Sequence, residues 1–142
     1  MPTMMRHLTV IARCATQYRT EKLAPLGLKG NHGSYLLQIC KDPGLTQDRL
    51  ARRLYIDKSN VARQLAVLEE QGYIRREPCP HDKRILRVYP TDKATEALPQ
   101  IRQVLREWET LVTQDLEEES REELTRILAL VRNRAAQWVE EG

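Results

Sequence analysis

The chain has 142 residues, of which 41% are apolar, and a formal net charge of +3, which suits one domain-sized unit with a modest core. No run approaches the roughly 18 uncharged apolar residues of a membrane span, and the N-terminus lacks an apolar signal core, so we expect a cytoplasmic protein without a membrane partner. The widely spaced Cys14, Cys40 and Cys79 fit neither a secreted disulfide framework nor a Cys-x-x-Cys zinc site, so reduced thiols are expected.

The charge is distributed unevenly along the chain. Residues 49–87 carry 10 basic and 5 acidic side chains, whereas residues 101–142 carry 6 basic and 10 acidic ones. A localised basic region is typical of a surface that binds nucleic acid.

The predicted elements begin with a long N-terminal helix. Its apolar stripe at helical spacing comprises Met4, Leu8, Ile11, Ala15 and Tyr18. The pattern ends around residues 25–27, and a second helix is predicted over residues 34–40, before a turn at Pro43 and Gly44.

Two short helices with a tight connector come next. Thr46 and Asp57 are suitable N-cap residues, and the second helix is expected to stop at Gly72. The inward positions of that second helix are Val61, Leu65 and Leu68. The pair predicts a helix-turn-helix.

A β-hairpin is predicted after the helix pair, with strands over residues 73–77 and 84–89. Pro78 and Pro80 cannot donate ladder hydrogen bonds, so we expect pairing to lapse between them. The intervening segment should form a projecting loop with Cys79 exposed.

From Thr91 onward the pattern is helical again, with Pro99 expected as a kink or an N-terminal interruption. Ser120 and Glu123 have the spacing of a capping box for the last helix. Long terminal helices that cannot bury their apolar stripes within one domain usually bury them against a partner, which favours a homodimer.

Taken together, these elements predict a mainly α fold with a small β-hairpin: a winged helix-turn-helix flanked by long N- and C-terminal dimerisation helices. The DNA-binding domain is expected over residues 31–94, and the dimerisation region over residues 1–30 and 95–142.

The candidate DNA-binding residues lie on the second helix of the pair and on the wing. Such a helix enters the major groove, and an arginine at a hairpin tip suits the minor groove. The set comprises Lys58, Ser59, Asn60, Arg63, Gln64, Arg76, Asp82, Lys83 and Arg84. Arginine can read guanine, asparagine or glutamine can read adenine, and lysine or serine can bind phosphates. The alternatives are a solvated helix face and, for Asp82 with Arg84, an exposed ion pair.

The run LTQDRLARRLYIDKSNVARQLAVLEEQGYIRREPCPHDKRILRVYPTDKA resembles the multiple antibiotic resistance regulator (MarR) family of bacterial and archaeal transcription factors. The match includes the Asp-x-Arg wing signature at Asp82 to Arg84 and extends to residues 27–39, with Pro90-Thr91 in place of the usual Leu-Thr. The resemblance implies a homodimer whose two winged domains reach adjacent major grooves of a pseudo-palindromic operator. It also implies that Asp82 orients Arg84 at the minor groove.

The family often responds to small phenolic or other aromatic acids. Arg13, Tyr18, His32 and Tyr35 are candidates to bind such an effector, although core packing is an alternative for Tyr18. The implied function is therefore a ligand-responsive repressor, and the sequence pattern fits an activator too.

Two alternative functions remain open, whereas a metal site, a cofactor and an enzyme have little support in the sequence. Cys14 follows a basic residue, which favours a reactive thiolate, so redox sensing is an alternative to inert packing. A winged helix used for protein contacts is the second alternative. Cys79 and His81 offer fewer ligands than a zinc site needs, no cofactor is expected, and no motif indicates an enzyme.

Overall fold

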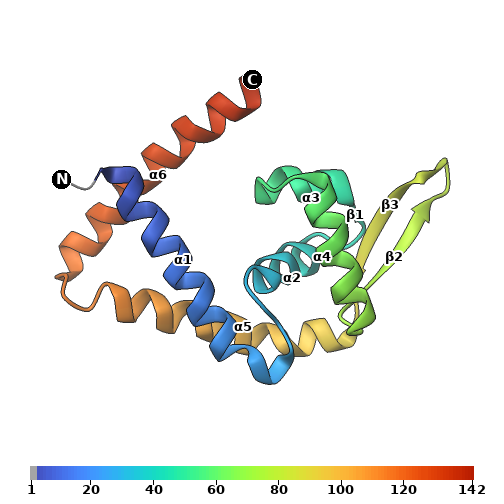
Figure 1. Ribbon diagram of the computed structural model, residues 1–142, viewed down its shortest axis with the longest axis horizontal. Coiled ribbons are helices and arrows are strands. Elements are labelled where there is room, and N and C mark those ends of the chain that lie inside the picture. The colour runs from blue at the N-terminus through green and yellow to red at the C-terminus, as the bar shows by residue number, and fades with distance from the viewer. Residues whose placement is uncertain (1–2) are drawn as a thin grey trace. The chain divides into compact units, whose positions relative to one another are not determined.

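The computed structural model describes residues 3–142, and Figure 1 shows the arrangement of its elements. In chain order these are α1 (Met4–Lys22), η1 (Ala24–Leu26), α2 (His32–Lys41), β1 (Leu45–Thr46), α3 (Gln47–Leu54), α4 (Lys58–Glu70), β2 (Ile74–Cys79), β3 (Asp82–Pro90), α5 (Asp92–Val112) and α6 (Glu118–Glu141). The predicted fold class is confirmed: helices predominate, and the small antiparallel sheet contains the wing. Within the described chain, no helix combines the length and apolar character that crossing a membrane requires.

The chain divides into two units between Arg106 and Glu107. The first unit contains α1 to β3 and most of α5, and the second contains the end of α5 together with α6. The predicted assignment of residues 31–94 to DNA binding and of 1–30 and 95–142 to dimerisation is a functional division, and it stays a prediction.

The helix boundaries follow from local capping. The Thr46 hydroxyl accepts a hydrogen bond from the Arg49 N–H at 3.2 Å, and the Asp57 carboxylate accepts one from the Asn60 N–H at 2.9 Å. Each bond satisfies a backbone donor that the first turn of a helix leaves unpaired. After α4, Gly72 adopts φ +84°, a left-handed conformation that favours glycine and ends the helix.

The core of the first unit lies between α2, α3, α4, the sheet and the N-terminal half of α5. Fully buried side chains from these elements include Leu36, Ile39, Leu50, Val61, Leu65, Leu68, Val88 and Ile101. The three inward residues predicted for α4 are among them, so the opposite face of α4 is left for solvent or a partner.

The sheet has three strands in the order β1-β3-β2, because the short strand β1, which was not predicted, pairs Leu45 with Val88. The regular pairing is interrupted between the prolines, as expected, but most of the segment stays in the hairpin strands and does not form the expected loop. Pro78 still pairs with Leu86, and Cys79 pairs with Asp82 after a bulge between residues 78 and 79. Because β2 is an edge strand, a proline can lie in it without breaking a central ladder.

Two other local expectations are also wrong. Cys79 is only 8% exposed, since strand pairing continues up to it. Ser120 does not cap α6, because the helix begins at Glu118, where acidic residues of the first turn suit the positive end of the helix dipole. Glu123 instead pairs with Arg126. Pro99 lies inside α5, which starts at Asp92 and continues past it.

Candidate nucleic-acid interface

The N-terminal half of α4 displays polar side chains on the face opposite its core residues. Lys58, Ser59 and Arg63 are exposed, as expected from the sequence. The Lys58 ammonium lies 3.2 Å from the Asp48 carboxylate, and both side chains are well exposed, so the ion pair connects the first turns of α3 and α4 at the surface. Such a pair contributes little to stability and leaves the lysine accessible.

Asn60 and Gln64 are less exposed than the helix pattern predicts. The Gln64 carbonyl oxygen lies 2.8 Å from Nε2 of His32, and its amide nitrogen donates to the Asn60 side-chain oxygen at 3.3 Å. Both side chains are therefore held by neighbours on the protein while remaining partly accessible.

The wing presents one arginine in a fixed geometry. The guanidinium of Arg84 donates to the Asp82 carboxylate through Nε at 3.1 Å and Nη2 at 3.1 Å, and the Arg84 backbone N–H donates to the same carboxylate at 3.0 Å. These bonds hold the pKa of Asp82 below its usual value, the side-chain bond being the larger cause. Since the Arg84 side chain is 90% exposed, the pair is at the surface, next to the exposed Lys83.

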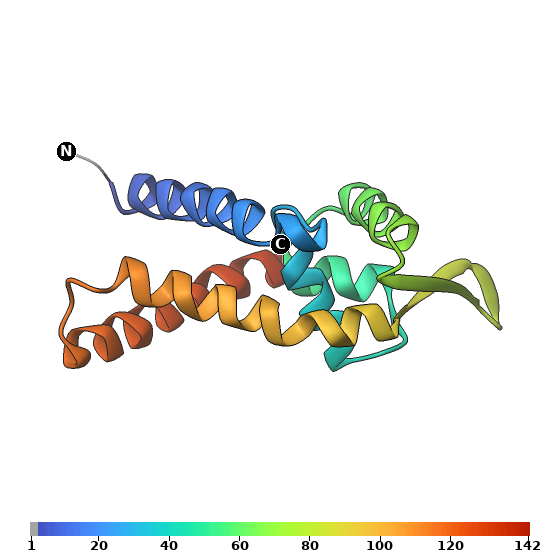
Figure 2. The same ribbon diagram turned by 90° about the horizontal axis from the view of Figure 1, so that it is seen from below.

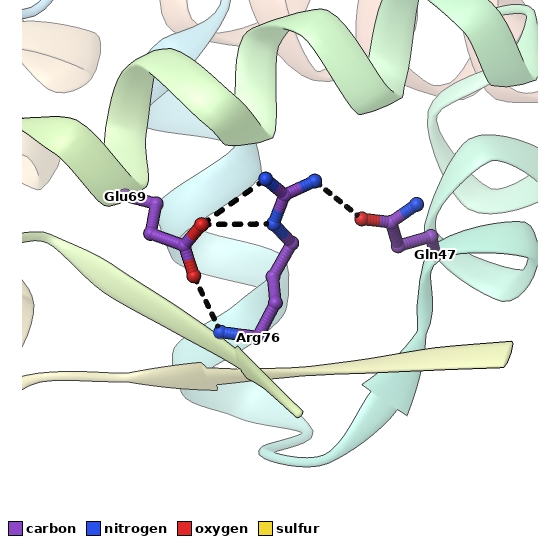
Figure 3. A network of polar contacts seen from close by, with 3 residues as sticks. All are labelled: Gln47, Glu69 and Arg76. Carbon is purple, nitrogen blue, oxygen red and sulfur yellow. Dashed lines mark hydrogen bonds and ion pairs between the residues drawn. The ribbon is translucent and has the colours of Figure 1, made fainter. Parts of the chain in front are cut away.

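Arg76 does not lie on this exposed surface, although the sequence placed it in the interface. Its guanidinium donates to Glu69 and, at 3.0 Å, to Gln47, while its backbone N–H donates to Glu69 at 2.8 Å (Figure 3). Only 19% of the Arg76 side chain is exposed. The residue therefore connects β2 to α4 and to the start of α3, and we leave it out of the interface.

Three exposed arginines of α3 were not among the predicted site residues, and one of them, Arg53, pairs with Asp42 at 2.7 Å. Arg49 and Arg52 face solvent because the buried positions of that helix are Leu50 and Ala51. The same helical spacing that identified the inward face could have identified them. In a helix-turn-helix the first helix crosses the DNA backbone, so these cations are suited to phosphates.

The four predicted effector-binding residues are not brought together. His32 and Tyr35 line a pocket of about 420 Å³ between the start of α2 and α4, together with Lys29, Gln64 and Gln71. Arg13 and Tyr18, both on α1, are not part of its lining: Arg13 is exposed, and Tyr18 packs against the core.

Two polar atoms of the pocket residues are buried without a hydrogen-bond partner among the described residues: the Tyr35 hydroxyl and the Gln71 side-chain oxygen. Burial, followed by the charge of Asp57, raises the pKa of Tyr35, so its phenol is neutral and can donate.

The cysteines differ in their surroundings. Cys14 is exposed on α1, and burial raises the pKa of the half-buried Cys40. The pKa of Cys79 is lowered, chiefly by a hydrogen bond from the His81 backbone. Residues 3–142 contain no group of three side chains suited to holding a metal ion.

Comparison with known proteins places the whole chain among regulators of transcription. The family model described as MarR family matches residues 26–85. An uncharacterized HTH-type transcriptional regulator of Bacillus subtilis (strain 168), YybA, is 27% identical, and the match covers 100% of this chain and 97% of the relative.

Solved structures agree with this similarity along almost the full chain. A crystal structure of MarR is 30% identical with a TM-score of 0.93, covering 99% of this chain and 96% of the other. A MarR family regulator from Listeria monocytogenes, described as complexed with 26mer DNA, is 26% identical with a TM-score of 0.86, covering 100% of this chain and 97% of the other.

Proposed function

This chain belongs to the MarR family of transcriptional regulators, and from that premise we propose that it acts in the cytoplasm as a homodimeric repressor of a pseudo-palindromic DNA operator. The Listeria monocytogenes relative complexed with 26mer DNA supports double-stranded DNA as the partner.

The proposal rests on one observation: the exposed polar side chains of α4 and those of the β2–β3 hairpin belong to neighbouring elements. The first turns of α4 expose Lys58, Ser59 and Arg63, and the neighbouring hairpin presents Arg84 in an orientation fixed by Asp82. Figure 2 shows α4 and the hairpin side by side, and Figure 1 agrees. A helix in the major groove and an arginine in the adjacent minor groove would use both elements on one duplex.

Salt dependence tests the proposal. A labelled duplex selected from a random pool should lose affinity on the order of a hundredfold between about 50 and 200 mM salt, because each neutralised phosphate releases counterions. A flat salt response, or equal affinity for the selected duplex and a scrambled one, would rule out sequence-specific DNA binding.

The homodimer is supported by apolar side chains that the chain leaves uncovered. In the described part of the chain α6 has no buried residue, and Ile127, Leu128 and Trp138 are 44%, 41% and 77% exposed. We expect a stable dimer by sedimentation at micromolar concentration, and we expect the double change Ile127→Glu with Leu128→Glu to give monomers. A parent protein that sediments as a monomer would overturn this part of the proposal.

Response to a small aromatic acid is supported by the pocket between α2 and α4. Lys29 supplies a cation for a carboxylate, and the Tyr35 hydroxyl and Gln71 oxygen lack partners within residues 3–142. Titrating 4-hydroxybenzoate into the protein–DNA complex should release DNA, and Tyr35→Phe should raise the concentration required. Unchanged DNA binding at saturating acid would count against an effector of this class.

An oxidant-sensing regulator is a second candidate, favoured by the exposure of the Cys14 thiol. Peroxide treatment followed by mass measurement would show whether this thiol is oxidised. If peroxide releases DNA from Cys14→Ser as readily as from the parent, Cys14 is not the sensor.

A further inference from the structure

A chain of three hydrogen bonds leads from the loop before α2 to the polar face of α4. The Lys29 backbone N–H lies 3.1 Å from Nδ1 of His32, and Nε2 of His32 lies 2.8 Å from the Gln64 side-chain oxygen. The Gln64 amide nitrogen then donates to the Asn60 side-chain oxygen at 3.3 Å. His32 is only 4% exposed, so its ring is held by burial as well as by these bonds.

The direction of the chain follows from its first bond. Because a backbone N–H can only donate, Nδ1 of His32 is the acceptor and the ring proton lies on Nε2. Nε2 therefore donates to Gln64, whose oxygen must face the histidine and whose amide nitrogen must face Asn60. Hydrogen bonds that run in one direction strengthen one another, so the orientation of both amides is fixed together.

The fixed orientation decides which polar groups α4 offers to a partner. The side-chain oxygens of Gln64 and Asn60 each accept a bond within the protein, while Asn60 Nδ2 donates none within residues 3–142. Each oxygen keeps a second lone pair but is turned toward its partner in the protein, so the Asn60 amide hydrogens are the least committed groups of the pair. Reading adenine in bidentate fashion needs an amide oxygen and an amide nitrogen together, whereas guanine offers two acceptors, N7 and O6.

We propose that His32 is a positioning residue that fixes the Gln64 and Asn60 amides as donors, so that this part of α4 selects guanine over adenine. The inference rests on the proposed DNA-binding function and refines it, since the sequence alone suggests adenine for these two side chains. It assigns a role in specificity to a buried residue of α2 that does not itself touch DNA.

Sequence selection from random duplexes tests this role. The parent and Gln64→Ala would first be compared, to identify the base pair whose preference depends on Gln64. Two duplexes that differ only there, with guanine or adenine, would then be titrated against the parent, His32→Phe and His32→Gln. Phenylalanine keeps an aromatic ring but lacks both nitrogens, and glutamine restores an N–H donor close to the position of Nε2.

We expect the parent to prefer guanine by about tenfold, His32→Phe to bind both duplexes nearly equally, and His32→Gln to recover most of the preference. In the Gln64→Ala background, His32→Phe should not change the ratio of affinities further. Using a ratio for each variant separates this role from a general loss of folded protein, which lowers both affinities alike.

A preference for adenine in the parent, an unchanged ratio in His32→Phe, or an effect that persists without Gln64 would overturn the inference while leaving DNA binding intact. If the parent selects no sequence at all, both the proposed function and the inference about His32 fail.

Discussion

The carboxylate of Asp82 holds the guanidinium of Arg84 by two side-chain bonds of 3.1 Å, although 90% of the arginine side chain is exposed. An exposed ion pair adds little to stability, so we expect its main effect to be on the orientation of Arg84. Asp82→Asn should leave the free energy of unfolding nearly unchanged and weaken binding of a selected duplex by roughly tenfold, through the lost orientation of one charge-assisted contact. Binding titrations and urea denaturation of Asp82→Asn would show whether DNA affinity falls while the free energy of unfolding stays the same.

The ionisation of Asp82 gives a pH prediction for the wing. Arg84 depresses the pKa of Asp82 in the folded protein below the usual 3.8, so the carboxylate's contribution is present above the unfolded-state pKa and is lost as pH falls through the folded one. The Asp82–Arg84 pair should therefore persist from about pH 8 down to pH 5 and be lost only in stronger acid. Carbon NMR of the Asp82 carboxyl should give a higher pKa in Arg84→Ala, and an identical titration in both proteins would contradict the pairing in solution.

Arg63 is the exposed arginine of the α4 surface, and we expect it to contact a base. Arg63→Ala should cost roughly 1–3 kcal/mol on the selected duplex and little on random DNA. Lys58→Ala is the matched control, because a lysine suited to phosphate should weaken binding of both duplexes to a similar degree. Equal losses from Arg63→Ala on the two duplexes would mean that Arg63 also contacts only phosphate.

Arg76 should matter for stability rather than for DNA contact. Removing its guanidinium leaves the Gln47 oxygen without this donor and leaves Glu69 with only the backbone N–H of residue 76, so Arg76→Ala should lower the free energy of unfolding by about 1–3 kcal/mol. Arg76→Lys should recover only part of this, because an ammonium cannot reproduce the planar fork. If Arg76→Ala weakened DNA binding without changing the urea midpoint, the interface predicted from the sequence would be the better description of this residue.

Tyr55, in the turn between α3 and α4, adopts φ +56° and ψ +40° and is 57% exposed. A bulky L-residue in this left-handed region costs about 1–2 kcal/mol, and asparagine tolerates the conformation better. Tyr55→Asn should therefore raise the free energy of unfolding by about 1 kcal/mol. Tyr55→Ala is the control, since its Cβ meets the same steric conflict and should bring no comparable gain.

Local signals predicted much of the fold. Thr46 and Asp57 cap α3 and α4 as expected, because an N-cap bond spans only three residues of sequence. Gly72 ends α4 for an equally local reason. The unpredicted strand β1 depends instead on pairing with β3, about 40 residues later, which two residues of sequence cannot reveal.

The candidate site was predicted less completely, because exposure on a helix face depends on the neighbours that pack there. Gln64 is held by a histidine 32 residues away, and Arg76 by a glutamine 29 residues away. Helical spacing places Gln64 correctly on the outer side of α4, yet it cannot show that His32 covers part of that side. The bond between Asp82 and Arg84, which the family resemblance implied, joins residues only two apart and so depends on local structure.

The position of β2 at the edge of the sheet has a consequence for solubility. An edge strand offers unpaired backbone groups to strands of other molecules and so invites aggregation. Here Pro78 removes one donor, the adjacent bulge interrupts the regular ladder, and the exposed Arg75 and Glu77 place charges along the strand. The hairpin can therefore extend into solvent in a crowded cell without recruiting further copies into a continuous sheet.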